Sequence, residues 1–328
     1  MSVPLTQRLP LVAPERLVAD LVVPRHFAAA TFDTYRPDPA HPSQAAALAE
    51  VRRLAAALTA PTPRRRLGRR PGPPPALYLD GGFGGGKTHL SAALAHAVGP
   101  AGAYGTFVEY THLVGALGFR ATVDALAPHR LVVIDEFELD DPGDTLLMSR
   151  MLRELSDRGV AVAATSNTLP DRLGEGRFAA EDFLREIQAL AARFAVVRID
   201  GPDYRHREEG VTPARPDAEV AAALAPVPGS QVVGFAELVA HLARVHPSRY
   251  RALLDGVTAL GLTGVGAAPT QDAALRLVVL VDRLYDADVP VLLGGADATA
   301  LFDDAMLHGG YRKKDLRALS RLTELTAR

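Results

Sequence analysis

The sequence predicts an α/β fold in which helices flank a parallel sheet, and three stretches of the 328 residues lead to this prediction. Residues 76–94 read as a short apolar strand, a glycine-rich loop and an amphipathic helix. Residues 131–134 (LVVI) form a continuous apolar run, which is typical of a central parallel strand buried on both faces. Residues 160–165 (VAVAAT) form a second such run. Strands of this kind, alternating with helical patterns, indicate a parallel sheet.

The first stretch contains the pattern G-x-x-x-x-G-K-[ST], at Gly81, Gly86, Lys87 and Thr88. In such loops backbone N–H groups surround phosphate oxygens, and the next helix presents its positive end to the anion. We therefore expect Lys87 to contact the β- and γ-phosphates of a nucleotide and Thr88 to ligate Mg²⁺. The predicted nucleotide-binding residues are Gly82, Phe83, Gly84, Gly85, Gly86, Lys87, Thr88 and His89.

Lysine usage strengthens this interpretation. The chain has 36 Lys and Arg residues together, and its lysines are Lys87, Lys313 and Lys314. The chain therefore uses arginine for almost all of its positive charges. A lysine retained in such a chain indicates a site that needs a compact ammonium rather than a planar guanidinium. The alternative is a glycine-rich turn in which the lysine is incidental.

Polar residues follow the two buried strands. Asp135 and Glu136 come directly after the first strand, and Asn167 comes shortly after the second. The carboxyl ends of parallel strands line the ligand crevice of an open α/β sheet. We expect Asp135 to hold Mg²⁺, Glu136 to polarise an attacking water, and Asn167 to orient that water or sense the γ-phosphate. Glu136, Asn167 and Lys87 are therefore predicted catalytic residues.

Composition limits the class of protein. A chain that is 48% hydrophobic and 23% charged, with net charge −2, is globular and has no bulk attraction to nucleic acid or membranes. The absence of cysteine excludes disulfides, thiol catalysis and Cys-ligated metals, and fits a reducing compartment such as the cytoplasm. No apolar run is long enough to predict a transmembrane segment, and the N-terminus lacks the apolar core of a signal peptide.

Stretches rich in proline, glycine and alanine predict the domain boundaries. Within the core a strand is expected at residues 105–110, followed by a helix. In the C-terminal part, which reads as mainly helical, short strands are expected at residues 257–262 and 289–293. The predicted parts are an N-terminal arm, helix and linker at 1–75, a core at 76–209, a linker at 210–229 and a C-terminal lid domain at 230–328.

Arginines raise two questions that sequence leaves open. The first linker carries a basic cluster that suits nucleic acid or an acidic partner, but no aromatic residue is interleaved for base stacking, so a solvated loop is favoured. Further arginines could approach a γ-phosphate from a neighbouring subunit or from the lid, although salt bridges are their commoner use. The three groups are Arg64, Arg65, Arg66, Arg69 and Arg70 in the linker, Arg172, Arg177, Arg185 and Arg193 in the core, and Arg276, Arg283, Arg317 and Arg321 in the lid.

The order of strand, phosphate loop, helix, hydrophobic-Asp-Glu and strand-Ser-Asn is similar to that of an AAA+ (P-loop) ATPase core. Longer segments resemble the ZapE-like family of these ATPases. Residues 134–173 resemble its second and third core motifs, and GPDYRHRE at 201–208 is similar to its Asp-Tyr-Arg signature. LVVLVDRLYDADVPVLLGGA at 277–296 and RALSRLTEL at 317–325 resemble its C-terminal motifs. Together the likeness covers most of residues 30–328.

The resemblance implies a Mg²⁺-dependent ATPase, with ATP and Mg²⁺ bound, that remodels or regulates a protein partner in bacterial cell division. It also implies a nucleotide-dependent homo-oligomer. Ala179 and Ala180 stand where the family tends to have a Gln-Arg pair, which makes Arg177 a candidate for the arginine acting on the neighbouring subunit. Two alternatives remain: a nucleic-acid-associated ATPase resembling helicase loaders, and a nucleotide-binding scaffold without turnover, which would not need Glu136.

Overall fold

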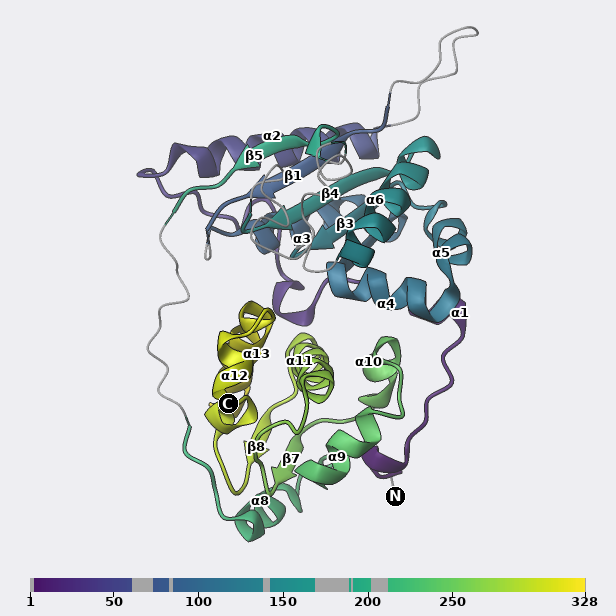
Figure 1. Ribbon diagram of the computed structural model, residues 1–328. Coiled ribbons are helices and arrows are strands. Elements are labelled where there is room, and N and C mark those ends of the chain that lie inside the picture. The colour runs from purple at the N-terminus through teal and green to yellow at the C-terminus, as the bar shows by residue number, and fades with distance from the viewer. Residues whose placement is uncertain are drawn as a thin grey trace, which may run out of the picture. The chain divides into compact units, whose positions relative to one another are not determined.

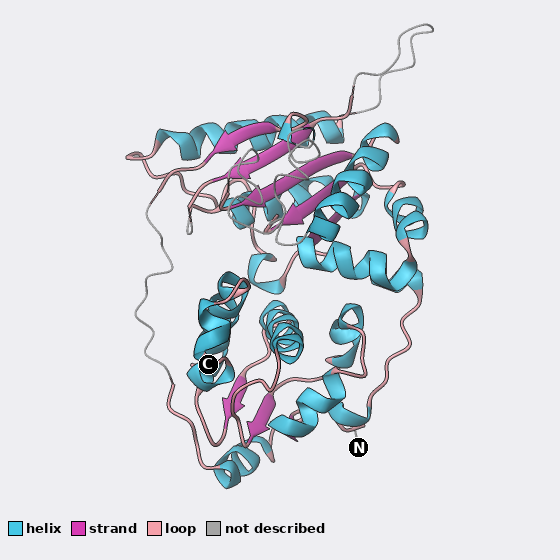
Figure 2. Ribbon diagram, in the orientation of Figure 1, coloured by secondary structure: helices cyan, strands magenta, loops and turns pink. Residues whose placement is uncertain are grey.

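The structure is a computed structural model, and helices and strands alternate along most of the chain (Figures 1 and 2). None of the helices described is both long enough and apolar enough to cross a membrane. The chain forms two compact units, the core unit (Pro14–Val23 and Phe27–Arg207) and the C-terminal unit (Met1–Ala13, Pro24–His26 and Glu208–Arg328). The residues described are 3–60, 73–82, 85–137, 142–168, 189, 191–201 and 212–327.

The core unit contains a five-stranded parallel sheet in the order β2-β3-β4-β1-β5. The register pairs Asp80 with Ser166 and Thr106 with Asp135, so the carboxyl ends of four neighbouring strands lie at one edge. This confirms the predicted parallel α/β sheet. The strands are β1 (Ala76–Asp80), β2 (Gly102–Thr106), β3 (Leu131–Asp135), β4 (Ala161–Ser166) and β5 (Ala195–Arg198).

Helices cover both faces of this sheet. Alternate residues of β3, Leu131 and Val133, belong to a buried cluster with α2 and α3, which explains why the run is apolar on every residue. In addition, α4 contacts β3 and α6 contacts β4. The helices are α1 (Pro14–Ala19), α2 (Pro42–Thr59), α3 (Lys87–Val98), η3 (Gly99–Ala101), α4 (Phe107–Leu117), α5 (Phe119–Leu126) and α6 (Pro142–Asp157).

The strand predicted at residues 105–110 is wrong beyond Thr106, where α4 begins. The Thr106 hydroxyl accepts a hydrogen bond from the Glu109 backbone N–H (3.3 Å), and the Glu109 carboxylate accepts one from the Thr106 backbone N–H (2.8 Å). This capping box satisfies N–H groups at the start of the helix. It therefore overrides the strand propensity of the Phe-Val-Glu-Tyr stretch.

The C-terminal unit is mostly helical, as predicted, and contains a three-stranded parallel sheet in the order β6-β7-β8. Leu5, from the N-terminal residues that belong to this unit, is fully buried in its core, and its backbone N–H donates to Gln231 Oε1 (3.0 Å). The elements are η1 (Leu5–Gln7), η2 (Arg25–Phe27), α8 (Asp217–Leu224), β6 (Gln231–Gly234), α9 (Phe235–Leu242), η5 (Pro247–Arg249), α10 (Tyr250–Leu253), β7 (Leu260–Thr263), α11 (Gln271–Asp286), β8 (Val291–Leu293), η6 (Ala298–Leu301), α12 (Asp304–His308) and α13 (Arg312–Thr326).

Two elements of this unit differ from the sequence prediction. The stretch predicted as a linker at residues 210–229 contains α8, whose Val220 and Leu224 are buried one turn apart. Strand β6 was not predicted at all. Its four residues alternate between buried and more exposed positions, which is too short a pattern to recognise without the neighbouring strand β7.

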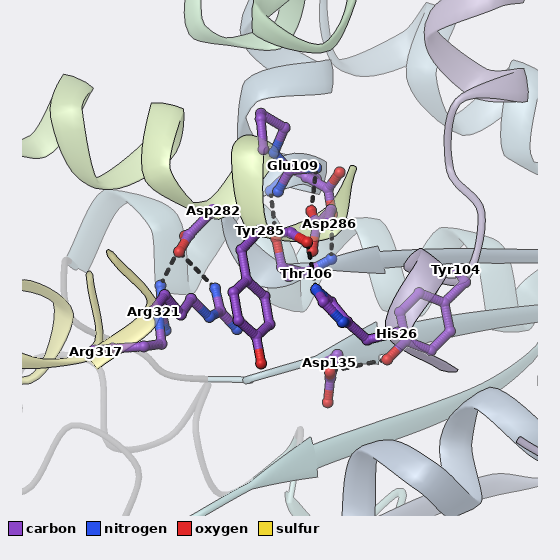
Figure 3. Close-up of polar contacts among 11 residues, drawn as sticks. His26, Tyr104, Thr106, Glu109, Asp135, Asp282, Tyr285, Asp286, Arg317 and Arg321 are labelled. Carbon is purple, nitrogen blue, oxygen red and sulfur yellow. Dashed lines mark hydrogen bonds and ion pairs between the residues drawn. The ribbon is translucent and has the colours of Figure 1, made fainter. Parts of the chain in front are cut away.

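The arginines of the predicted lid pair with carboxylates of their own unit. Asp282, which is buried, accepts hydrogen bonds from both Arg317 and Arg321 (Figure 3). These contacts agree with the salt-bridge alternative for the four residues. The pairs are Arg276–Asp272, Arg283–Asp286, Arg317–Asp282 and Arg321–Asp282.

Replacing Asp315 by Asn should stabilise the chain at neutral pH. Asp315 is 0% exposed, and neither carboxylate oxygen has a hydrogen-bond partner among the residues described. Burial raises the pKa of the Asp315 carboxyl to about 6, opposed by the charge of Lys314. Between the ordinary pKa of about 4 and this value, the folded state binds more protons than the unfolded state, so stability falls as pH rises.

We therefore expect D315N and wild type to have similar stability near pH 4, and the variant to gain about 2 kcal/mol by about pH 7.5. Urea denaturation followed by circular dichroism at both pH values measures this difference. Asp304→Asn, at an exposed first-turn position of α12, serves as the matched control for replacing a helix aspartate by asparagine as such. An equal effect of D315N at both pH values would contradict the raised pKa.

Candidate functional site

The predicted phosphate loop connects β1 to α3 at the carboxyl edge of the core sheet. A Cβ added to Gly81 would lie 2.1 Å from the backbone oxygen of Ile199. Gly86, the N-cap of α3, has φ +79°, and a Cβ there would lie 2.5 Å from the ring of Tyr35. Both positions therefore require glycine, the first because of backbone packing and the second also because of its left-handed conformation.

Lys87, the first residue of α3, is 9% exposed. Its ammonium donates hydrogen bonds to the backbone oxygens of Gly81 (2.7 Å) and Gly82 (2.6 Å). The positive charge therefore lies against the backbone oxygens of Gly81 and Gly82, which precede the helix. Phe83 and Gly84, which complete the predicted loop, lie outside the residues described.

The Asp135 carboxylate, at the end of β3, receives hydroxyl groups from three elements. Thr88 Oγ1 in α3 is 3.4 Å from Asp135 Oδ1, and Thr165 Oγ1 in β4 donates to the same oxygen. The Tyr104 hydroxyl in β2 donates to Oδ2 at 2.8 Å (Figure 3). The structure thus brings together Thr88 and Asp135, the two residues predicted to hold Mg²⁺.

Glu136 has φ +55°, a left-handed conformation that is uncommon for any residue other than glycine. For an L-amino acid this conformation costs roughly 1–2 kcal/mol. Its backbone N–H donates to Thr165 Oγ1 (3.1 Å), and the next N–H, of Phe137, donates to the Thr165 backbone oxygen (2.6 Å). Backbone strain that is held in place by neighbouring contacts, as here, is concentrated at functional sites.

The structure describes some of the remaining predicted residues. Asn167 is half-buried and follows β4, which lies between β1 and β3, so it belongs to the same edge as Asp135. His89 Nε2 lies 3.0 Å from the Thr31 backbone oxygen and 3.1 Å from Thr34 Oγ1. Its ring is thus held by the segment that precedes α2.

Several predicted features lie outside the residues described, so the structure does not test them. These are the basic cluster of the first linker, the Asp-Tyr-Arg motif and the candidate arginine Arg177 together with Arg172 and Arg185. Arg193, the fourth candidate of that group, is described and exposed.

Three residues at this edge were not singled out from the sequence. They are Tyr104, Thr165 and Tyr35, whose hydroxyl donates to the Gly85 backbone oxygen at 3.0 Å. Thr165 carried a weak signal, because it is a hydroxyl residue at the end of an otherwise apolar run. The two tyrosines carried no such signal in the sequence. The partner of Tyr35 is 50 residues away and that of Tyr104 is 31 residues away.

Burial governs the protonation of two groups near the loop. Burial raises the pKa of the Asp80 carboxyl, and the charges of Arg198 and Lys87 oppose this shift. Burial, followed by the charge of Asp135, raises the pKa of the Tyr104 hydroxyl well above its usual 10. Tyr104 therefore remains protonated at neutral pH and is a hydrogen-bond donor to Asp135.

The donor set suits Mg²⁺. A hydroxyl and a carboxylate are hard oxygen ligands, and Thr88 and Asp135 place them 3.4 Å apart beside the loop. Mg²⁺ commonly takes one or two carboxylates from the protein and completes its shell with water and substrate phosphates. In the described part of the chain, no three His, Asp or Glu side chains are grouped so that they could hold a metal ion by themselves.

The chain is similar in sequence to parts of known proteins. An uncharacterized protein of Schizosaccharomyces pombe, C115.02c, is 30% identical over 153 residues, which are 41% of this chain and 34% of that protein. Cell division protein ZapE of Escherichia coli K12 is 34% identical over 90 residues, 27% of this chain and 22% of ZapE. The chain thus matches about a third or less of the length of these relatives.

Among solved structures, domain III of the replication initiation protein DnaA from Thermotoga maritima is similar over 54% of this chain and 69% of that one. Its TM-score is 0.40 at 18% identity. The family model described as AFG1-like ATPase matches residues 11–216 and 210–328, which together extend over nearly the whole chain. The chain therefore belongs to the AFG1-like ATPase family.

Proposed function

We propose that this protein hydrolyses ATP in a Mg²⁺-dependent reaction at the carboxyl edge of the core sheet. One observation supports the proposal above all: the hydroxyl of Thr88, the residue after Lys87, lies 3.4 Å from the carboxylate of Asp135, the residue before Glu136, in a chain that belongs to an ATPase family. Each of these residue types has a distinct part in phosphoryl transfer.

Binding depends on the loop and on α3. Backbone N–H groups of the loop and the start of α3 face the phosphates, and Lys87 exchanges its bonds to the loop oxygens for the β- and γ-phosphates. Thr88 and Asp135 would hold Mg²⁺, which would supply charge neutralisation at the phosphate oxygens.

Hydrolysis depends on the two remaining polar residues. Glu136 accepts a proton from a water molecule as the water oxygen bonds to the γ-phosphorus and the bond to the β-γ bridging oxygen breaks. Asn167 orients this water through its amide. The products are ADP and inorganic phosphate. In this proposal the strained backbone of Glu136, held by Thr165, fixes the point from which the side chain of residue 136 extends.

The cellular role that we propose is remodelling or regulation of a protein partner by an oligomer that assembles with nucleotide, in the cytoplasm. Family membership and the partial likeness to a cell division protein support this role and suggest the division machinery as the partner. In this proposal the C-terminal unit acts as the lid. Nucleic acid is a less favoured partner, because the net charge of −2 gives no bulk attraction to it.

Measurement of inorganic phosphate release tests the proposed activity. The purified chain should release phosphate from ATP in the presence of Mg²⁺. This release should stop when EDTA removes the metal. A nonhydrolysable ATP analogue should raise the melting temperature in Mg²⁺ without phosphate release. Thermal stabilisation by ATP itself, with no phosphate released, would contradict the proposal and favour the nucleotide-binding scaffold.

A further inference from the structure

The Asp135 carboxylate is held from both sides by hydroxyl groups of the neighbouring strands. Strand β3 lies between β2 and β4 in the core sheet. Tyr104 of β2 donates to one carboxylate oxygen at 2.8 Å, and Thr165 of β4 donates to the other. Tyr104, Asp135 and Thr165 are all buried, so water does not compete readily for these bonds.

These bonds leave Asp135 little freedom. Each hydroxyl comes from a strand whose backbone is paired in register with β3, so both donors are held next to the carboxylate. Rotating the carboxylate about the Cβ–Cγ bond of Asp135 would move both oxygens away from their hydroxyl donors. The arrangement turns Asp135 Oδ1 toward Thr88, the other predicted Mg²⁺ ligand.

We propose that Tyr104 and Thr165 are positioning residues that fix the Asp135 carboxylate for Mg²⁺, and that Thr165 also sets the position of Glu136. This inference rests on the proposed function and assigns two residues to the same site. Hydrogen-bond donors behind a metal-binding carboxylate orient it and tune its affinity for the metal. A carboxylate that is already held in place loses little rotational freedom when the metal binds. The metal is therefore bound more tightly.

The two residues are expected to differ in effect. Tyr104 contacts Asp135, so loss of its hydroxyl should affect the metal alone. The Thr165 hydroxyl accepts from the Glu136 N–H (3.1 Å) while it donates to Asp135. Loss of that hydroxyl should therefore weaken the metal site and also release the strained Glu136 backbone.

The experiment measures thermodynamic coupling between metal and nucleotide. The dissociation constant of a fluorescent ATP analogue is determined with Mg²⁺ and with EDTA, and the ratio is the Mg²⁺-dependent gain in affinity. In Tyr104→Phe this gain should fall about tenfold, while the affinity in EDTA stays at the wild-type value. Phenylalanine keeps the buried ring and removes only the hydroxyl.

Tyr110→Phe is the matched control. Tyr110 is fully buried in the same unit, and its hydroxyl donates to backbone oxygens of the same two strands, Ala103 (3.3 Å) and Val133 (3.1 Å). This variant removes an equivalent hydroxyl without touching Asp135, so its Mg²⁺-dependent gain should equal that of wild type. Equal gains in Tyr104→Phe and Tyr110→Phe would overturn the role of Tyr104.

Thr165 provides a second, independent test. Thr165→Val should lower both the Mg²⁺-dependent gain and the rate of phosphate release, and Thr165→Ser, which keeps the hydroxyl, should restore both. Thr122→Val removes another fully buried hydroxyl, bonded to the backbone of Gly118, and serves as the control. If serine failed to restore the gain, packing rather than the hydroxyl would be responsible and the positioning role would be wrong.

Failure of this inference is distinguishable from failure of the proposed function. If wild type binds nucleotide with a Mg²⁺-dependent gain but Tyr104→Phe and Thr165→Val keep that gain, only the positioning role is overturned. If wild type shows no such gain, the proposed Mg²⁺-ATP site itself is wrong, and the positioning role is overturned with it. A general loss of affinity in EDTA as well as in Mg²⁺ would also overturn it.

Discussion

Replacing Glu136 by Gln should lower the rate of phosphate release by at least about a hundredfold and leave nucleotide affinity unchanged. An amide has nearly the same shape as a carboxylate but cannot accept the proton of the attacking water. The backbone contacts to Thr165 do not involve the side chain of residue 136, so the strained turn is retained. Steady-state phosphate release and titration with a fluorescent ATP analogue measure the two quantities separately.

Glu154→Gln is the matched control for this substitution. Glu154 lies on α6, and its carboxylate pairs with Arg150 at an exposed position (3.2 Å). Its replacement should leave phosphate release at the wild-type rate. Wild-type turnover in Glu136→Gln would show that another residue activates the water. Because Glu136→Gln should retain ATP, light scattering of this variant with and without ATP also tests the proposed nucleotide-dependent oligomer.

Replacing Lys87 by Ala should weaken nucleotide binding by about a hundredfold or more and abolish measurable phosphate release. The substitution removes the ammonium that lies within the loop, and the negative phosphates lose their charged partner. Alanine favours helix, so the start of α3 should persist. Lys87→Arg should not restore binding, because a planar guanidinium does not match a compact ammonium at a position that is 9% exposed.

Lys313→Ala controls for the loss of a lysine as such. Lys313 is exposed on α13 in the C-terminal unit, so its removal should change neither affinity nor turnover. Binding is measured by the same fluorescent titration, and the melting temperature shows whether each variant is folded. Normal nucleotide affinity in a folded Lys87→Ala protein would contradict the placement of the nucleotide at this loop.

Much of the core unit was predictable because its signals are local in sequence. The apolar runs of β3 and β4 indicated buried parallel strands, and the structure has these strands within a residue of the predicted bounds. The spacing of the loop predicted where Lys87 and Thr88 lie, at the start of α3. Parallel topology then implied that Asp135 and Asn167 belong to one edge, because all strands point the same way.

Elements that depend on a partner far away in sequence were missed or misplaced. Strand β6 is four residues long and is identified only by its pairing with β7. The end of β2 was predicted too late for a different, local reason: the Thr106-x-x-Glu109 capping box, which begins α4, was outweighed in the prediction by the strand propensity of the same stretch. Helix α8 was hidden in a stretch rich in proline and alanine, where it is held by burial of Val220 and Leu224.

By itself, the sequence determined the class of fold, the phosphate loop and the acidic and amide residues that follow the buried strands. Each of these rests on residue type and spacing within a few positions, which sequence displays directly. Only the tertiary structure decided which hydroxyls hold Asp135 and which contact fixes the strained Glu136. Those contacts join Tyr104 and Thr165 to β3 across about 30 residues, and sheet order alone brings such distant residues together.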